Sequence, residues 1–532
     1  MNIKNKFQVI VSAVALFGLT ACNDYLDQVP DDRAQVNSVE KVENLLTSAY
    51  PDHAPNFLFE MSSDNVTDNG SQYTAQPNQD EMYRFQDVPT RGNDDPYHLW
   101  DNMYQCVGTV NEAIAALDEL GGEKAHPAEY AEARLCRAYN MYQLANIFCM
   151  AYDPTKAKEY LGLPYPTEPE QDVNTHYTRG TLQELYDNIN SDIEAALPNV
   201  SEGYMKTPKF HFNKSAAYAF AARFNLMMHN YDKAIEYANV VLGANPVTRM
   251  RDYTQFQQLS AADLQNAYVK SSENANLLII AAYSALGRAL QGNSYYRRYN
   301  HNDPMCSFET FWPEGPWGTG SSNNTLIYAT RLFGATDQQI YFPKVREFWE
   351  VTDKVNDTGF AHIVFPAFST EETDLVRAEA YAMKKDYTHA IADMNAWIET
   401  HCEKVHINPS SGKVTKRPTL TEESINEFMD GIFYTEVNPA SNAQRTIKKT
   451  LHPQGFTVET GTQENIIQLI LHMRRLETWG EGQRFIDIKR YGIEYAHRID
   501  GESPVIFKAG DLRGAIQIPE DVRKAGLEAN PR

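Results

Sequence analysis

Two short segments decide the fold: DLVRAEAY over Asp374–Tyr381 and YTHAIAD over Tyr387–Asp393. Small alanines at helical spacing let two helices approach closely, and tyrosines fill the groove between them. The same pattern occurs 156 residues earlier; the matching pairs are Ala222 and Ala378, Tyr231 and Tyr387, Ala234 and Ala390, Ile235 and Ile391, Asn239 and Asn395. The repeat predicts two tetratricopeptide-like helical hairpins, over residues 213–242 and 371–400.

Further helices follow from the same apolar spacing outside the repeat. It predicts them over residues 100–120, 127–150 and 464–479. Thr181 with Glu184 three residues later has the spacing of a capping box, so a helix to Leu197 is expected. Strand-like alternation is scarce. We therefore predict a mainly all-α fold, in which helical hairpins form a scaffold that carries long irregular loops over residues 61–98, 291–325 and 403–462.

The length and charge of the chain narrow its organisation and its partners. Its 532 residues would suggest about three domains on length alone, but the dispersed hairpins favour one scaffold with insertions. Acidic residues outnumber basic ones by 70 to 48, which gives a formal charge of −22. This balance argues against nucleic acid as a partner, because a phosphate backbone needs a basic face.

The first 22 residues indicate export and lipidation. Lys4 and Lys6 precede a 13-residue apolar run, which is too short to span a bilayer of about 30 Å. The ending Leu19-Thr20-Ala21-Cys22 resembles a bacterial lipobox. We expect residues 1–21 to be a signal peptide that is removed, Cys22 to carry lipid, residues 22–40 to form an acidic tether and residues 41–532 to form one globular domain. An ordinary signal with a chance cysteine is the alternative.

The remaining cysteines suggest no disulfide or metal framework. They are Cys106, Cys136, Cys149, Cys306 and Cys402. An odd number cannot all pair within one chain, and C-x-x-C does not occur. The preferred interpretation is buried free thiols.

Two of the loops carry the side chains that sugar recognition needs. A sugar offers one apolar face and many hydroxyls, so it is bound by flat aromatic rings and planar polar groups. The candidates are Tyr295, Tyr296, Arg298, Asn300, Trp312 and Trp317 in the loop around 291–325, and Asp64, Asn65, Tyr83 and Arg84 in the loop around 61–98. In the alternative interpretation, the tryptophans fasten the loop to the scaffold, and Asp64 and Asn65 cap a turn.

Four passages together resemble the SusD/RagB family of outer-membrane nutrient-binding lipoproteins. They are Leu19–Asp32, Ala131–Pro166, Asp374–Asp393 and Arg474–Arg490. The resemblance implies a SusD-like fold and a surface lipoprotein that faces the cell exterior. It implies carbohydrate binding without catalysis, in polysaccharide utilisation, beside a SusC-like TonB-dependent transporter that imports the oligosaccharide. It also implies that the N-terminal loop joins the mid-chain loop to form the site.

Other functions stay open at this point. A helical scaffold or peptide-binding subunit of the same importer type, without glycan contact, is one alternative; a surface glycoside hydrolase is another. Catalytic motifs are absent from the sequence, no cofactor is expected, and a structural calcium ion has no EF-hand motif behind it. We interpret Arg474–Arg490 as structural, with Arg484 and Asp487 as an ion pair. The sequence does not name the glycan.

Overall fold

The computed structural model of the chain describes residues 36–170, 175–291, 295–356 and 358–532. The predicted signal peptide and the lipidation site at Cys22 lie outside the described residues, as does most of the predicted tether. The first described helix, α2 (Val39–Leu46), begins just inside the range predicted as the tether. None of the described helices is long and apolar enough to cross a membrane.

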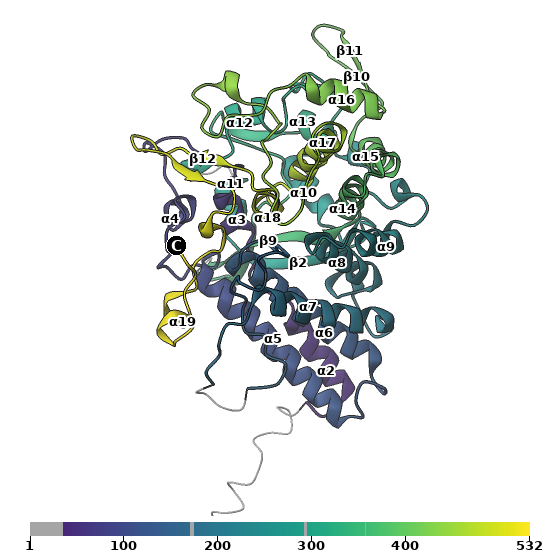
Figure 1. Cartoon of the computed structure of the whole chain (residues 1–532), viewed down its shortest axis with the longest axis vertical. Coiled ribbons are helices and arrows are strands. Elements are labelled where there is room, and N and C mark those ends of the chain that lie inside the picture. The colour runs from purple at the N-terminus through teal and green to yellow at the C-terminus, as the bar shows by residue number, and fades with distance from the viewer. Residues whose placement is uncertain (1–35, 171–174, 292–294, 357) are drawn as a thin grey trace, which may run out of the picture.

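The N-terminal third forms a helical layer in the lower half of Figure 1. It consists of α2 with three longer helices, α5 (Pro96–Glu119), α6 (Pro127–Phe148) and α7 (Leu182–Ala196). The predicted capping box is confirmed. The Thr181 side chain accepts from the Glu184 main-chain N–H, and the Glu184 carboxylate accepts from the Thr181 main-chain N–H. Helix α6 is buried on nearly every side, so it is the centre of this layer.

The end of α6 is completed by distant parts of the chain. The last carbonyls of a helix have no partner within it. The Lys489 ammonium donates to the carbonyl oxygens of Asn146 and Cys149, at 2.8 Å each. The main-chain N–H of Ile516 donates to Ile147, and the amide of Asn530 donates to the Phe148 oxygen at 3.0 Å.

The two predicted hairpins are confirmed. They are α8 (Lys214–Met227) with α9 (Tyr231–Leu242), and α14 (Thr370–Met383) with α15 (Tyr387–His401). The turns match as closely as the helices do, because His229 and Lys385, also 156 residues apart, both adopt a left-handed backbone with φ of 61° and 63°.

Two helical hairpins are fixed in the same way, each by a buried arginine of its own. Arg137 of α6 binds Asp192 of α7 through two bonds of 2.7 and 2.8 Å and donates to Asn111 of α5. Arg377 of α14 likewise binds Asp393 of α15 through two bonds, and it donates to Asn239 of α9. Each arginine therefore ties its own hairpin to one further helix, which is α5 for Arg137 and α9 for Arg377. Lysine could not reproduce this planar two-point geometry.

Two helices towards the C-terminus, α17 (Thr462–Glu477) and α18 (Gln483–Tyr491), are rich in buried charge. The expected pair of Arg484 with Asp487 is wrong. Arg484 instead reaches across to Asp64, with bonds of 2.7 and 2.8 Å, while Asp487 pairs with Arg474 and Arg490. Because Asp64 belongs to the N-terminal loop, this contact fastens that loop to the core.

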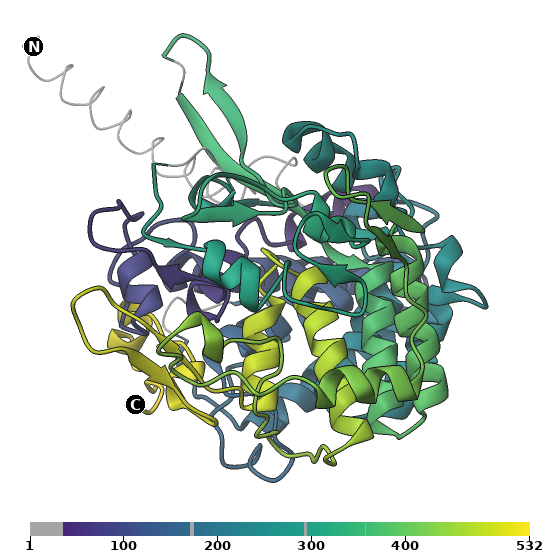
Figure 2. The same cartoon turned by 90° about the horizontal axis from the view of Figure 1, so that it is seen from above.

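One three-stranded antiparallel sheet interrupts the helices. Its order is β2 (Asn276–Tyr283), β9 (Thr358–Ser369) and β8 (Phe348–Asp353). Strand β9 leads directly into α14, so the sheet is joined to the second hairpin. The β8–β9 hairpin extends well beyond the body of the molecule, at the top of Figure 2.

The three predicted loops are less irregular than expected, because short elements pair within them. The remaining helices are α3 (Asn56–Ser62), α4 (Gln79–Tyr83), α10 (Ala261–Tyr268), α11 (Leu286–Leu290), α12 (Asp303–Phe308), α13 (Ile327–Thr330), α16 (Glu422–Asp430) and α19 (Glu520–Lys524). The remaining strands are β1 (Thr67–Asp68), β3 (Tyr299–Asn300), β4 (Gly318–Thr319), β5 (Asn323–Asn324), β6 (Phe333–Thr336), β7 (Gln339–Tyr341), β10 (Val405–Ile407), β11 (Val414–Lys416), β12 (Tyr495–His497) and β13 (Val505–Phe507).

The cysteine interpretation is confirmed within the described chain. Cys106, Cys136, Cys149, Cys306 and Cys402 are all buried and none is in a disulfide. They therefore act as small apolar side chains of the core.

Candidate functional site

The two loops expected to form a site lie side by side. Strand β1 pairs with β3, so that Asp68 is opposite Tyr299, and Thr74 bridges to Tyr296. The Asn69 amide adds a bond of 2.7 Å to the Arg297 carbonyl oxygen. Residues more than 200 positions apart are therefore held in register by main-chain bonds, which no local sequence pattern reveals.

Five of the ten candidate residues of the two loops are interior. Trp317 is only 1% exposed, and the others are also buried: Asp64, Asn65, Tyr83 and Asn300. A sugar needs an accessible ring or polar group, so these five leave the candidate site. Their side chains are held by interior contacts.

Buried polar partners explain why the N-terminal residues point inward. Burial alone would raise the pKa of Asp64, but the guanidinium groups of Arg475 and Arg484 outweigh burial and hold that pKa well below its usual range. Asn65 donates to Glu60 at 2.9 Å. Tyr83 stacks on His497, with ring centroids 3.9 Å apart, and donates to the Arg498 carbonyl oxygen.

The mid-chain residues are held in the same manner. Trp317 packs between Trp397 and His472, each with a centroid distance of 5.9 Å, so this tryptophan plugs its loop into the scaffold. Asn300 donates to the Ala289 carbonyl oxygen at 2.7 Å. Trp312 is half-buried, and its indole N–H donates to the Ala329 carbonyl oxygen at 2.9 Å.

Four candidates keep accessible surface. Tyr295 is 76% exposed, and its ring lies edge-on to that of Tyr296 at 5.5 Å. Arg298 pairs with Asp68 at 3.3 Å, and Arg84 binds Glu502 through two bonds of 2.7 and 3.0 Å. These arginines are positioned by carboxylates, so they form rigid planar groups at the edge of the two loops.

A further exposed aromatic residue is absent from the sequence-based candidates. Trp349 on β8 is 46% exposed, and the Arg288 guanidinium lies 5.6 Å from the centre of its ring. Arg288 is held by two bonds to Glu347, which raise its pKa, and Tyr296 contributes a smaller electrostatic increase. Arg288 is therefore in contact with Trp349 and within electrostatic range of Tyr296.

We call Tyr295, Tyr296 and Trp349, together with Arg288, the aromatic platform. Helix α11 sets its geometry, because a Cβ at Gly287 would lie 2.2 Å from the Glu347 nitrogen; only glycine allows this approach. Opposite Trp349 and Val351 on the sheet stand the small residues Ala361 and Gly359, so the tryptophan side of the hairpin is flat. The alternation FWEVTD over Phe348–Asp353 was the signal for a half-exposed strand.

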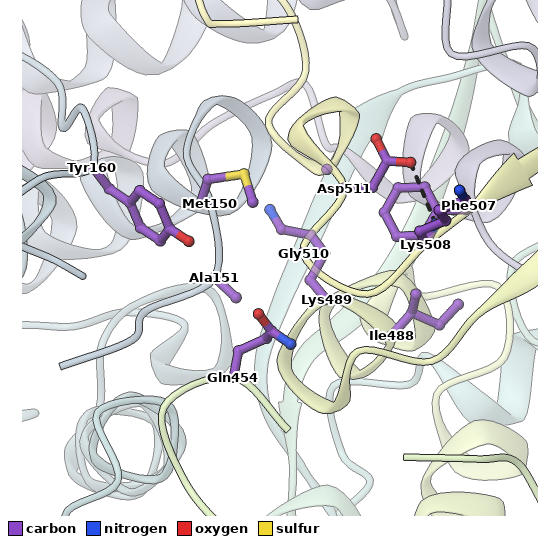
Figure 3. Close-up of a pocket in the computed structure, with 11 residues that line it drawn as sticks. Met150, Ala151, Tyr160, Gln454, Ile488, Lys489, Phe507, Lys508, Gly510 and Asp511 are labelled. Carbon is purple, nitrogen blue, oxygen red and sulfur yellow. Dashed lines mark hydrogen bonds between the residues drawn. The ribbon is translucent and has the colours of Figure 1, made fainter. Parts of the chain in front are cut away.

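A small cavity near the end of α6 is a structural feature and not a ligand site. Figure 3 shows Lys489 pointing into it between Met150 and Gly510. Its volume is about 10 Å³, enough for one water molecule. Burial lowers the pKa of Lys489 to about 8, and its ammonium is committed to the α6 carbonyls.

No metal centre is evident in the part of the chain that the structure describes: no group of three or more His, Cys, Asp or Glu side chains is arranged to hold an ion. Asp64, the most strongly shifted loop carboxylate, is fully engaged by arginines. The exposed groups of the aromatic platform are suited to stacking and hydrogen bonding.

The fold and the site define a helical-repeat binding scaffold that presents rings and planar polar groups on its surface. A family model described as "Starch-binding associating with outer membrane" matches residues 24–226, and the SusD family model matches residues 249–503. The chain belongs to the SusD/RagB family, as its sequence resemblance suggested.

Solved structures show the same fold over nearly the whole chain. A putative sugar-binding protein from Bacteroides vulgatus is 15% identical with a TM-score of 0.64, and the alignment covers 93% of this chain and 99% of that one. A SusD superfamily protein from Bacteroides thetaiotaomicron is 17% identical with a TM-score of 0.59 and the same coverage. A laminarin-binding SusD-like protein is 16% identical with a TM-score of 0.53, again with 93% and 99% covered. No curated protein sequence matches the chain.

Proposed function

We propose that the protein is a lipid-anchored surface receptor that captures an oligosaccharide and passes it to a SusC-like TonB-dependent transporter in the outer membrane. The aromatic platform is the observation that carries the proposal. Exposed large rings are costly in water and useful to a sugar, whose apolar face can stack on them. Family membership and the laminarin-binding relative support a glycan as the ligand.

The platform also has the polar groups that sugar hydroxyls require. Arg288 is held by Glu347 and contacts Trp349, and Arg298, two residues after Tyr296 in the chain, is held by Asp68. Because each arginine is held by a carboxylate, its remaining N–H groups keep a fixed direction. Such pre-positioned donors lower the entropic cost of binding.

The binding test is isothermal titration of the mature protein with a panel of plant, algal and host oligosaccharides. We expect weak to moderate binding to one glycan class, and a loss of about tenfold or more in the Trp349→Ala and Tyr295→Ala double variant, since stacked aromatic anchors dominate such contacts. Phe433→Ala is the matched control, because Phe433 is a 53% exposed ring in a different loop.

Two outcomes would contradict the proposal. Failure of every glycan to bind would favour the scaffold or peptide-binding alternative, in which the protein contacts only the transporter or a peptide. Release of shorter products from a polysaccharide by the purified protein would show a hydrolase. Copurification of a transporter from membranes is expected for both the receptor and the scaffold, so it does not separate them.

A further inference from the structure

A second cavity lies on another part of the molecule, between α5, residues 164–170 and 175–177, and α19 with the residues that follow it. Its volume is about 500 Å³, within the range of small-molecule sites. Figure 1 shows α5 and α19 at the lower left, whereas the platform strand β8 belongs to the projecting hairpin of Figure 2. The aromatic platform contributes none of the described residues that line this cavity.

One face of α5 forms the floor of the cavity. Trp100, Tyr104, Gly108 and Glu112 follow at four-residue intervals, which places them along one side of a helix. The rings of Trp100 and Tyr104 lie 4.8 Å apart, and the Tyr104 hydroxyl donates to the Pro164 oxygen at 3.0 Å. Asn111 donates to the Pro166 and Glu168 oxygens at 3.2 Å. These bonds hold the opposite wall at a fixed distance from the floor.

Gly108 is the observation that points to a ligand. It lies in the interior of a 24-residue helix, where glycine costs about 1 kcal/mol relative to alanine. A Cβ built at Gly108 meets no atom within 4 Å, so neither packing nor backbone geometry requires glycine there. The missing side chain leaves the floor of the cavity open beside the two rings.

Acidic side chains predominate around the cavity; the nearest arginine contact is from Arg137, which donates to the lining residue Asn111 and is paired with Asp192, and His176 is also in the lining. The acidic residues of the cavity are Asp101, Glu112, Glu168 and Glu170, and among the described lining residues there is no lysine or arginine. Tyr177 adds a third ring, 37% exposed, and donates to Glu170 at 2.7 Å. Aromatic walls with surrounding carboxylates are complementary to a cation that carries an apolar surface.

We propose that this cavity binds a ring-shaped ligand that carries a protonated amine, such as an amino sugar. The apolar face of the ring would lie on Trp100 and Tyr104 above Gly108, and the ammonium would be neutralised by Glu112 and Glu168. The site is independent of the proposed glycan receptor function, because it shares no residue with the platform.

A matched pair of probes tests this inference. The glucosamine trimer and its fully N-acetylated form differ only in charge and acetyl groups, and both are titrated at mildly acidic pH, where the free amines are protonated. We expect the charged trimer to bind at least tenfold more tightly, with an affinity that falls as salt is added. Equal affinity for the two trimers, or no binding of the charged one, would overturn the inference.

Variants locate the binding. Gly108→Trp should fill the cavity and abolish binding of the charged trimer, while Gly108→Ala should keep most of it; both should unfold at or above the temperature of the wild type. The charge-neutral Glu112→Gln and Glu168→Gln double variant should lose the preference for the charged trimer even if Gly108→Trp fails to fold. Trp349→Ala should leave the affinity for the charged trimer unchanged. If the charged trimer still bound with its preference to Gly108→Trp and to the Glu112→Gln and Glu168→Gln double variant, the site would be refuted.

Discussion

Asp94 shows how a single buried carboxyl couples the N-terminal loop to the sheet. It accepts from the Ser284 hydroxyl and, at 2.8 Å, from the Ala285 main-chain N–H. Burial, with a smaller contribution from the neighbouring Asp95, raises the pKa of Asp94 to about 7 despite these bonds. The carboxyl is thus easier to protonate in the folded protein than in the unfolded chain.

This pKa gives a signed prediction. Since the folded pKa lies above the unfolded value of 3.8, the contribution of Asp94 to stability is fully present below pH 4 and is lost as pH rises to about 7. Each pKa unit corresponds to about 1.4 kcal/mol. Asp94→Asn, which imitates the protonated acid, should gain stability relative to the wild type between pH 5 and pH 8. Urea unfolding at both values measures this gain.

The contradicting result is an Asp94→Asn difference that does not change with pH. Asp337→Asn is the control, because that residue is exposed on the surface. Its free energy of unfolding should follow the wild type at both pH values.

Single residues were also where sequence reasoning about the site was weakest. Trp317 and Trp349 are indistinguishable by type, yet one is 1% and the other 46% exposed. The difference arises because Trp317 packs against Trp397 and His472, whereas Trp349 lies opposite the small Ala361 on the sheet and contacts Arg288 on the surface. Contacts between distant segments decide how exposed each tryptophan side chain is. The composition of a loop therefore indicated the region of the site but not its individual residues.

At the scale of elements, the helices could be predicted and the short strands could not. Alanine and tyrosine spacing located α14 and α15 to within a few residues because the signal is periodic and local. The pairing of β1 with β3 involves two residues from each strand and depends on main-chain bonds between distant loops. Such short pairs carry no periodicity of their own.

The hydrogen bonds that cap the C-terminal end of α6 allow a prediction about stability. Asn530→Ala would leave the Phe148 carbonyl without its donor and should cost about 1–3 kcal/mol, the typical penalty for an unsatisfied buried polar group. Chemical denaturation measures the loss. Glu528→Ala is the matched control, since that side chain is exposed two residues earlier; equal stability of the two variants would refute a capping role.

At the scale of the whole molecule, removal of the signal peptide would change the net charge and leave Cys22 as the proposed site of lipid attachment. Removal of the signal peptide with Lys4 and Lys6 would take the formal charge from −22 to −24. None of the described helices is long and apolar enough to cross a membrane. In the lipid attachment that we propose at Cys22, several acyl chains would contribute about 0.8 kcal/mol for each buried CH₂.

Replacement of that cysteine is therefore informative. Cys22→Ala should move the protein from the membrane fraction to the soluble fraction of cells and leave its glycan affinity unchanged. Immunoblotting of the fractions, with titration of the purified variant, checks both parts. Cys106→Ala is the control, because Cys106 is a buried core thiol. A Cys22→Ala protein that stays with the membrane would show that something other than lipid holds it.

The cap on α6 also sets an order in time. Helix α6 is made early, but two donors for its last carbonyls come from residues 516 and 530. At roughly 5–20 residues per second, the ribosome needs tens of seconds to reach them. During that interval the last carbonyl groups of the central helix lack these two donors. A chain that ends before residue 516 lacks both of them, so the C-terminal end of its α6 stays incompletely capped.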